Sequence, residues 1–545
     1  MSEINCGQAL IKLLEKYGVE TVFGIPGVHT LDIYRGLADS PIQHVQARHE
    51  QGAAFMADGY ARASGKPGVC ILISGPGVTN GLTAMGQAYA DSIPMLMISS
   101  TTASYTLGKG WGCLHEVPDL QAVTDPLTAM SATALAPSDV PELLGQAFTI
   151  FASQRPRPVH IAVPIDVLAM PVTDNWAPVQ LPQRALAHPN DVDAAADMLM
   201  TGQRPLIMVG GGAVNAAGTL TEIAELLNAS VVTSNAGKGI VPDTHPLNLG
   251  GSIWRKAVQD HVSEADVILA IGTELSETDS FVERLDIKGK LIRVDIDPHK
   301  INDLYPADLG IIADAGSTAS ALLSSLKTKS AKPAARDTKT AVSAIIEELM
   351  TDISVNEAQH IKTLQALREI LPDDAVIAGD IAQLVYTGSF AMPVDAPRLW
   401  HYPAGFCTLG CGLPNGMGAK MAFPDKPVIV LAGDGGFMFT VQDLITAAEL
   451  ELSLPIIIWN NGALLQIKED MEHRNIPPIG VEGINPDFNL LAQSMGCYGT
   501  RPTGMDEFKT AVSTALQANR PTIIELVQGA DWLMPNDLAQ ATLTK

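Results

Sequence analysis

Short runs of β-branched and aliphatic residues alternate with longer amphipathic stretches along most of the chain. In the first third, apolar runs predict strands at 21–24, 69–74, 95–99 and 159–163, and apolar residues at helical spacing predict helices at 7–17 and 50–63. This alternation is typical of βαβ units, in which the strands are parallel and helices cover both faces of the sheet.

The same alternation occurs twice more. Further apolar runs predict strands at 206–209, 231–233, 267–270 and 292–296, and then at 375–378, 428–431, 455–459 and 522–526. Proline-rich sequence at 171–189 and a basic, Ala/Pro-rich segment at 327–339 separate the three sets and predict linkers. We therefore predict an α/β protein with three doubly wound domains and mainly parallel sheets, at residues 1–175, 190–328 and 345–545.

Composition narrows the class of protein. Of 545 residues, 46% are hydrophobic and 17% charged, which predicts a large buried core. The 35 Lys and Arg residues against 59 Asp and Glu give a formal charge of -24, which argues against nucleic acid or an anionic membrane as a partner. No apolar run approaches the ~20 residues that span a bilayer, and neither a signal-peptide pattern nor a disulfide-like cysteine spacing is present. We expect a cytoplasmic protein.

Two motifs at the ends of neighbouring predicted strands indicate a ligand site. Asp434 and the glycines around it, Gly433, Gly435 and Gly436, close one strand, and Asn460 and Asn461 close the next. Open α/β sheets bind ligands at this edge. Asp434 and Asn461 offer oxygen ligands that suit Mg²⁺. The glycines let backbone N–H groups approach a diphosphate. A lone GDG also fits an ordinary turn, but the paired motifs favour a site.

These motifs resemble the diphosphate and metal motif of thiamine diphosphate enzymes. Further segments resemble acetolactate synthases and related 2-oxo acid decarboxylases, in the order expected for that family: Phe23-Gly24-Ile25-Pro26-Gly27, Arg48-His49-Glu50-Gln51-Gly52-Ala53, Ser74-Gly75-Pro76-Gly77-Val78-Thr79-Asn80 and Gly410-Cys411-Gly412-Leu413-Pro414. The resemblance covers nearly the whole chain. It implies pyrimidine, middle and diphosphate domains, with thiamine diphosphate and Mg²⁺ as cofactors.

The resemblance also implies roles for single residues. Glu50 corresponds to the acid that hydrogen-bonds N1′ of the aminopyrimidine and so promotes loss of the thiazolium C2 proton. Outside this motif, an acid at a helix start is commonly a capping residue. Leu409 and Gly27 would lie against the cofactor, and the carbonyl of Ala463 would join Asp434 and Asn461 on the metal. The family pairs Glu50 with a metal site across two subunits, which implies a homodimer or homotetramer with shared active sites.

Departures from the acetolactate synthases indicate which reaction follows loss of CO₂. Protonation of the resulting intermediate gives an aldehyde, whereas its attack on a second 2-oxo acid gives an acetohydroxy acid. The synthases have Phe-Gln-Glu where this chain has Leu114-His115-Glu116, a Trp in the acceptor pocket where it has Asp470, and an Arg where it has Glu274. We therefore predict a non-oxidative 2-oxo acid decarboxylase. An acetolactate synthase-like carboligase is the alternative.

The replacements also indicate a substrate class. A carboxylate binds a guanidinium group well, and the sequences around His29 and His115 are similar to 5-guanidino-2-oxopentanoate decarboxylases. We expect Asp470 and Gln466 to contact the substrate, although the acids near Asp470 also fit a solvated helix face. His29 and His115 are candidates for proton transfer because imidazole titrates near neutrality. Both also fit ordinary loop histidines.

Three further features leave alternatives open. Gly210-Gly211-Gly212 resembles a nucleotide-binding turn, but glycine triplets also close tight turns, and we do not expect FAD. Asn415 interrupts the usual small-residue run and predicts an altered pocket. A thiamine diphosphate-binding protein without catalytic activity is a third functional class, which the presence of Glu50 and Asp434 disfavours.

Overall fold

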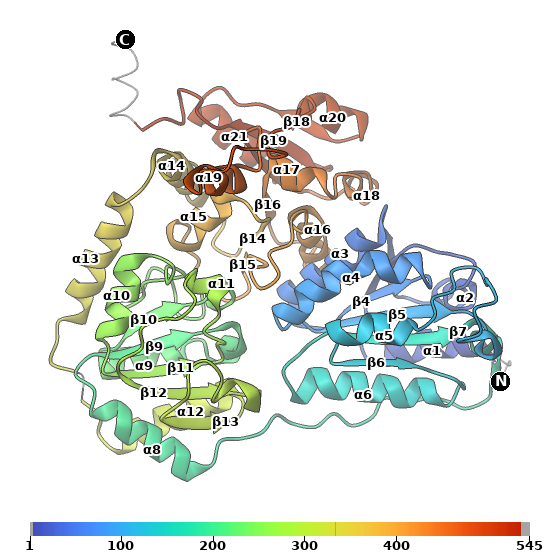
Figure 1. Ribbon diagram of the computed structural model, residues 1–545, viewed down its shortest axis with the longest axis horizontal. Helices are drawn as coiled ribbons and strands as arrows, with labels where there is room; N and C mark the ends of the chain where they lie inside the picture. The colour runs from blue at the N-terminus through green and yellow to red at the C-terminus, as the bar shows by residue number, and fades with distance from the viewer. Residues whose placement is uncertain (1–3, 333, 536–545) are drawn as a thin grey trace.

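The computed structural model describes residues 4–332 and 334–535, which form three α/β units (Figure 1). The first unit is blue and cyan, the second green, and the third yellow to red. The strands of each main sheet are all parallel, as predicted. The predicted first and third domains extend to residues 1 and 545, and those ends lie outside the described residues.

The first unit contains a six-stranded sheet in the order β3-β2-β4-β5-β7-β6. Its strands are β2 (Thr21–Gly24), β3 (Gln43–Gln46), β4 (Gly68–Leu72), β5 (Met95–Thr101), β6 (Met130–Thr133) and β7 (Val159–Pro164). Its helices are α1 (Cys6–Lys16), α2 (Leu31–Leu37), α3 (Glu50–Ser64), α4 (Pro76–Ala90), α5 (Leu120–Thr124), α6 (Asp139–Ser153) and α7 (Ile165–Ala169). A short antiparallel pair, β1 (Ile4–Asn5) with β8 (Pro171–Val172), brings the two ends of the unit together.

The second unit has five strands in the order β10-β9-β11-β12-β13. They are β9 (Pro205–Val209), β10 (Ser230–Thr233), β11 (Val267–Ile271), β12 (Lys290–Asp295) and β13 (Leu309–Ile312). The helices are α8 (Pro189–Met200), α9 (Thr219–Leu227), α10 (Lys256–Glu264), α11 (Glu277–Ser280) and α12 (Ala315–Thr328). The chain reverses its direction of winding at β9, so a switch point of the kind that binds ligands in other doubly wound sheets lies between β9 and β11.

The third unit has six strands in the order β15-β14-β16-β17-β19-β18. They are β14 (Val376–Gly379), β15 (Trp400–His401), β16 (Val428–Gly433), β17 (Pro455–Asn460), β18 (Tyr498–Thr500) and β19 (Thr522–Val527). The helices are α14 (Val355–Ile370), α15 (Gln383–Ala391), α16 (Gly412–Ala422), α17 (Asp434–Met438), α18 (Asp443–Glu449), α19 (Leu465–His473), α20 (Phe488–Ser494) and α21 (Met505–Ala515). Helix α13 (Thr338–Thr351) precedes them in the chain but packs its buried side chains on the second unit. Among the described residues, no helix is both long and apolar enough to cross a membrane.

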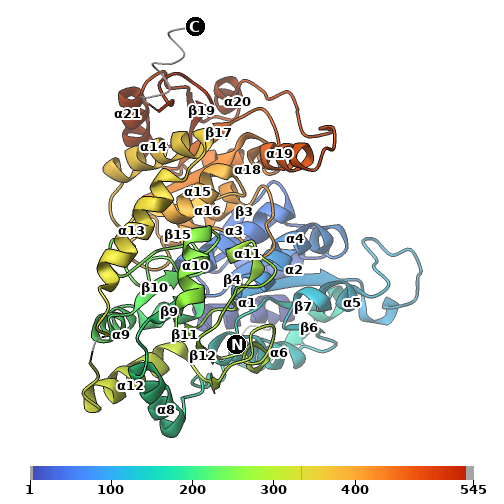
Figure 2. The ribbon, with the colours of Figure 1, turned by 60° about the vertical axis from the view of Figure 1, so that its left-hand side comes forward.

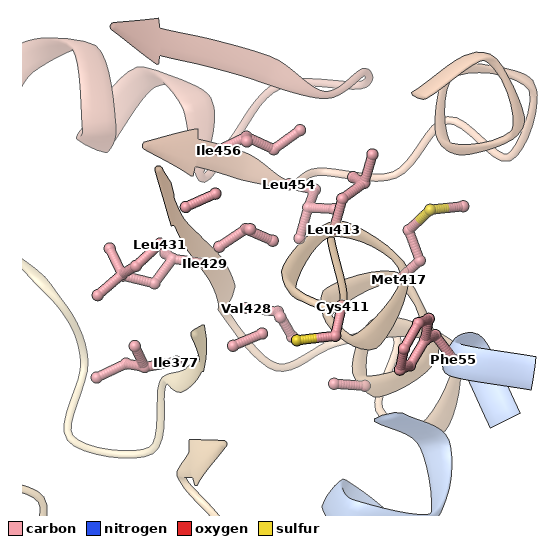
Figure 3. Packing of buried hydrophobic residues seen from close by; sticks show 14 of the residues in the cluster. Phe55, Ile377, Cys411, Leu413, Met417, Val428, Ile429, Leu431, Leu454 and Ile456 are labelled. Atoms are coloured by element: carbon pink, nitrogen blue, oxygen red, sulfur yellow. The ribbon is translucent and has the colours of Figure 1, made fainter. Parts of the chain in front are cut away.

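Helices α3 and α16 join the first and third units through one continuous core. Phe55 of α3 belongs to the same buried cluster as Leu413 and Met417 of α16 (Figure 3). The two backbones approach so closely that a Cβ on Gly418 would lie 2.0 Å from the carbonyl oxygen of Met56, and a Cβ on Gly59 would lie 2.2 Å from that of Asn415. Only glycine fits at these two positions.

A buried charge network lies beside this helix crossing. The Arg62 guanidinium donates to Asp58 on its own helix (2.6 Å) and to Asp91 after α4 (2.7 Å). Asn415, oriented to satisfy its neighbours, donates its amide to Asp58 (3.3 Å) and to the carbonyl of Phe55 (2.6 Å). The Asn415 side chain thus supplies a hydrogen bond to a buried carboxylate, which accounts for its position in the otherwise small-residue run.

We predict that Gly418→Ala destabilises the protein by about 2 kcal/mol, because overpacking against backbone outweighs the roughly 1 kcal/mol gained in helix propensity. Scanning calorimetry should show the first unfolding transition at a lower temperature. Gly483→Ala is the control, because a Cβ on Gly483 meets no atom within 4 Å. Equal unfolding temperatures for Gly418→Ala and Gly483→Ala would contradict the role of this close contact in stability.

Candidate functional site

The GDG and NN motifs meet at the carboxyl edge of the third sheet. Gly433 of β16 lies opposite Trp459 of β17, so the residues that follow leave the sheet side by side. Oδ2 of Asp434 accepts from the backbone N–H of Gly462 (3.0 Å), and Oδ1 of Asn461 accepts from the N–H of Ala463 (3.1 Å). The structure therefore brings together the residues expected to hold a metal.

Two features of this edge were missed by the sequence analysis. A short helix, α17, begins at Asp434 itself. Asn485, in the loop after α19, donates its amide to Asp434 (2.6 Å) and to Asn460 (3.0 Å). Asn485 belongs to no recognisable motif, so only the folded chain reveals that it orients the Asp434 carboxylate.

Within residues 4–332 and 334–535, no group of three or more His, Cys, Asp or Glu residues is placed to hold a metal ion. The predicted ligands are instead one carboxylate, one amide and one backbone carbonyl. Oxygen ligands with few charges are typical of Mg²⁺, which keeps several waters and takes further oxygens from a phosphate. The residues present therefore fit a magnesium ion that is shared with a diphosphate.

The loop that carries Leu409 is fixed by Asp380, a residue that the sequence analysis missed. Asp380 is fully buried directly after β14. Its carboxylate accepts from the backbone N–H groups of Gly410 and Gly412, both at 3.0 Å. A Cβ on Gly436 would lie 2.9 Å from the same carboxylate. Asp380 thus holds the Leu409 loop against the predicted diphosphate-binding turn.

Glu50 is the first residue of α3, and its neighbours leave one carboxylate oxygen accessible. His49 caps the helix, because its Nδ1 accepts from the N–H of Gln51 (3.2 Å). Asn80 of α4 donates to Oε2 of Glu50 (2.9 Å). Gly77 stands beside Oε1, where a Cβ would approach to 3.6 Å. Asn80 therefore orients the carboxylate, and the small residue at position 77 leaves Oε1 open.

Gly27 lies near Glu50 in the first unit. A Cβ on Gly27 would lie 2.4 Å from Ile73, and a Cβ on Gly77 would lie 2.7 Å from the same side chain. The turn after β2 and the first turn of α4 therefore both pack on Ile73, next to the start of α3.

His29 and His115 lie side by side in the first unit. Their rings meet edge to face, with centroids 5.5 Å apart. Nδ1 of His29 is buried and has no hydrogen-bond partner among the described residues. Burial lowers the pKa of His29, and the neighbouring His115 lowers it further. An imidazole in this setting gives up a proton readily, which suits a role in proton transfer.

His115 belongs to a loop that projects between β5 and α5 (Figure 2). His115 itself has a positive φ of 58°. Glu116 stabilises the loop, since its carboxylate accepts from the N–H groups of Gly110, Gly112 and Cys113 at 2.7–3.0 Å. The backbone hydrogen bonds lower the pKa of Glu116. Glu116 therefore fixes the conformation of the loop in which His115 lies.

Asp470 and Gln466 lie one turn apart on α19, and Nε2 of Gln466 approaches Oδ1 of Asp470 at 3.4 Å. Gln383, at the start of α15, donates to Gln466 (3.2 Å) and to Glu469 (2.8 Å). Burial raises the pKa of Tyr386 on α15, and the charges of Asp380 and Asp470 raise it further. The acidic part of α19 therefore lies over α15, within electrostatic reach of the diphosphate edge.

Glu274 is already paired within the chain. Its carboxylate contacts the guanidinium of Arg155, from the loop after α6, and the ammonium of Lys300 (2.8 Å). A carboxylate with two cationic partners is not free to bind a cationic substrate. Glu274 instead joins the first unit to the second.

The glycines of the Gly210–Gly212 turn are explained by close packing within the second unit. A Cβ on Gly210 would lie 2.2 Å from the carbonyl oxygen of Gly272, and one on Gly212 would lie 3.0 Å from the Cα of Gly272. The turn and the loop after β11 therefore pack backbone to backbone. The triplet needs no bound nucleotide to account for it.

The predicted site has two groups of residues, on two different units. Among the described residues, no hydrogen bond joins Glu50, His29 or His115 to Asp434, Asn461 or Ala463. The first group surrounds the turns after β2 and β4, and the second lies at the edge of the third sheet.

Three family models match the chain. They are described as "Thiamine pyrophosphate enzyme, N-terminal TPP binding domain" (residues 4–123), "Thiamine pyrophosphate enzyme, central domain" (192–322) and "Thiamine pyrophosphate enzyme, C-terminal TPP binding domain" (380–526). Thiamine pyrophosphate is another name for thiamine diphosphate. The three matches fall on the three sheet-containing units in order.

Curated relatives match over nearly their full length. "Probable 2-ketoarginine decarboxylase AruI" of Pseudomonas aeruginosa is 49% identical, covering 96% of this chain and 94% of its own. "Probable acetolactate synthase large subunit" of Methanocaldococcus jannaschii is 33% identical, covering 95% and 91%. "Acetolactate synthase isozyme 3 large subunit" of Escherichia coli is 31% identical, covering 98% and 97%.

We predict that His29 titrates below the ~6.5 of a free imidazole, because burial disfavours its charged form. Replacing His115 with Asn should raise the pKa of His29 without restoring the free value, since burial is the larger cause. Histidine-labelled protein observed by NMR across pH 4–8 measures this, and His29→Asn identifies the signal. A His29 pKa at or above the free value would contradict the geometry.

Proposed function

This chain belongs to the thiamine pyrophosphate enzyme family, and from that premise we propose that it decarboxylates 5-guanidino-2-oxopentanoate to the corresponding aldehyde without an oxidant. The observation that carries the proposal is the near-full-length similarity to the Pseudomonas aeruginosa relative, whose name specifies 2-ketoarginine, the same compound. Acetolactate synthases share less of the sequence.

The proposed cofactors are thiamine diphosphate and Mg²⁺. Asp434, Asn461 and the carbonyl of Ala463 hold the metal, and the backbone of Gly433, Gly435 and Gly436 receives the diphosphate. The hydrogen bond from Asn485 to Asp434 supports this role, because a ligand carboxylate is oriented by a neighbouring donor. Leu409, whose loop is held by Asp380, packs against the cofactor. Gly27 leaves room for the cofactor in the first unit.

When bound, thiamine diphosphate supplies the carbanion that attacks the keto carbon and accepts the electron pair released with CO₂. Glu50 holds a proton at N1′ of the aminopyrimidine, and the hydrogen bond from Asn80 keeps its carboxyl group in one orientation. His29 and His115 handle the proton that the product carbon takes up. The depressed pKa of His29 makes its protonated form a stronger acid than free imidazolium.

The active unit of this proposal is a homodimer or a dimer of dimers, in which Glu50 of one chain serves the cofactor held by its partner. Large apolar side chains lie exposed beside both halves of the site, which supports an interface there. Those in the first unit are Val28, Leu31 and Leu114, and those in the third unit are Phe406 and Phe439.

In the substrate site, Asp470 and Gln466 bind the guanidinium end of the substrate. A guanidinium offers several N–H donors in one plane, which suits a carboxylate next to an amide oxygen. The contact between Gln383 and Glu469 supports this assignment, because it holds a second carboxylate of α19 toward α15. Two carboxylates on α19 favour a cationic substrate over pyruvate.

We predict that Glu50→Gln lowers turnover by about 100-fold or more while cofactor binding is retained, because loss of a general acid–base group costs 10²–10⁴-fold. Stopped-flow decarboxylation with saturating thiamine diphosphate measures turnover, and fluorescence quenching measures cofactor affinity. Unchanged turnover would remove Glu50 from this role.

The proposed substrate is tested by CO₂ release from a panel of 2-oxo acids, with and without thiamine diphosphate. The panel contains 5-guanidino-2-oxopentanoate, pyruvate, benzoylformate and branched-chain 2-oxo acids. We expect the guanidino acid to be preferred, and Asp470→Asn to raise its KM about 10-fold, or about 1.4 kcal/mol, through loss of a charge-assisted contact. The KM of an uncharged substrate should not change.

Glu472→Gln provides the matched control, because it removes the same charge from an exposed position on α19. If both variants raise the KM for the guanidino acid equally, the total negative charge of α19 determines the KM, and Asp470 has no specific contact with the substrate. Pyruvate as the best substrate by a wide margin would overturn the cationic-substrate proposal. Acetoin detected after acidification of a reaction with pyruvate alone would favour the carboligase.

A further inference from the structure

Asp443 is a buried carboxylate to which no role has been assigned. It is the first residue of α18, in the third unit, and its side chain is fully buried. A buried carboxylate is costly unless it is well hydrogen-bonded. Its position therefore requires an explanation.

One face of α18 contacts the connection between β3 and α3 in the first unit. Oδ1 of Asp443 accepts from the backbone N–H of Arg48 (2.8 Å). Thr446 donates to the carbonyl of Gln46 (2.9 Å), and Glu449 pairs with the Arg48 side chain. Residues three apart lie on one side of a helix, so successive turns of α18 bind the segment that leads into Glu50.

The second oxygen of Asp443 is pressed against the first turn of α3. A Cβ on Gly52 would lie 1.8 Å from Oδ2, so no larger residue fits there. Oδ2 is buried and has no hydrogen-bond partner among the described residues. Burial raises the pKa of Asp443 to about 7, although the hydrogen bond and charge of Arg48 oppose the shift.

We propose that Asp443 is a positioning residue for Glu50: through the N–H of Arg48 and its contact with Gly52, it fixes the start of α3 and hence the direction of the Glu50 carboxyl group. This inference rests on the role of Glu50 in the proposed function. A misplacement of about 1 Å in a reacting group costs on the order of 100-fold in rate, so a rigid support two residues from Glu50 affects the chemistry without touching the cofactor.

The contact with the N–H of Arg48 needs only an acceptor oxygen at position 443. Two substitutions of Asp443 therefore differ in their expected effect. Asp443→Asn keeps the Oδ1 acceptor and nearly the same volume, whereas Asp443→Ala removes the acceptor. Asp243→Ala is the matched control. The Asp243 side chain is only 6% exposed and accepts a backbone N–H across a unit boundary, from Val394 (3.1 Å). Its other hydrogen-bond partners are Lys238 and Asn248, so none of its recorded partners lies on α3 or α18.

Two measurements on the full chain test the proposal. Amide hydrogen exchange, followed by mass spectrometry without cofactor, reports the order of residues 46–54. Exchange of the cofactor's C2 proton in the holoenzyme, followed by NMR after acid quench, reports whether Glu50 is correctly placed. We expect Asp443→Ala to speed amide exchange in 46–54 and to slow C2-proton exchange, each about 10-fold. Asp443→Asn should stay within about 3-fold of the unmodified protein in both, and Asp243→Ala should leave both unchanged.

Each contrary outcome is decisive. Normal C2-proton exchange in Asp443→Ala overturns the proposal, even if the segment loosens, because the role is then only structural. Asp443→Asn behaving like Asp443→Ala also overturns it, because an acceptor would not be sufficient. Unchanged C2-proton exchange in Glu50→Gln would overturn the proposed function and the positioning role with it. Slowed exchange in Glu50→Gln but not in Asp443→Ala would overturn the positioning role alone.

Discussion

The contact between α3 and α16 is the constraint on which the rest of the molecule depends. A helix of the first unit and a helix of the third unit meet backbone to backbone, and the glycines at positions 59 and 418 permit this close approach. Interiors packed at this density transmit displacements instead of absorbing them. Because α3 begins with Glu50 and α16 follows the Leu409 loop, one crossing fixes the relative positions of these two residues of the candidate site.

Buried aspartates join the three units by binding backbone N–H groups across their boundaries. Asp91 of the first unit accepts from Gly405, Asp243 of the second from Val394, and Asp443 of the third from Arg48. A carboxylate bonded to a backbone amide fixes the main chain itself, whereas a pair of long side chains leaves rotamers free. The net acidity of the chain includes these carboxylates, which act as structural joints between the units.

The sequence predicted the three sheets because their central strands are continuous apolar runs. The strands that it missed in the main sheets, β3, β6, β13, β15 and β18, all lie at sheet edges, where partial exposure weakens the apolar signal or only two residues pair. The GDG and NN motifs likewise identified Asp434 and Asn461. Asp380, Asn485 and Asp443 escaped detection, because each acts through a backbone amide or side chain far away in sequence. The hydrogen bond from Asn415 to Asp58 was missed for the same reason.

Helix α19 contrasts with this rigid frame, since none of its residues is fully buried. Substitutions on such a surface usually change stability by less than about 0.5 kcal/mol, whereas those at the α3–α16 crossing are severely restricted. The fold therefore separates α19, where substitutions are tolerated, from the α3–α16 crossing, where they are not. Mutations can therefore alter the proposed substrate contacts on α19 during evolution without passing through intermediates that no longer fold.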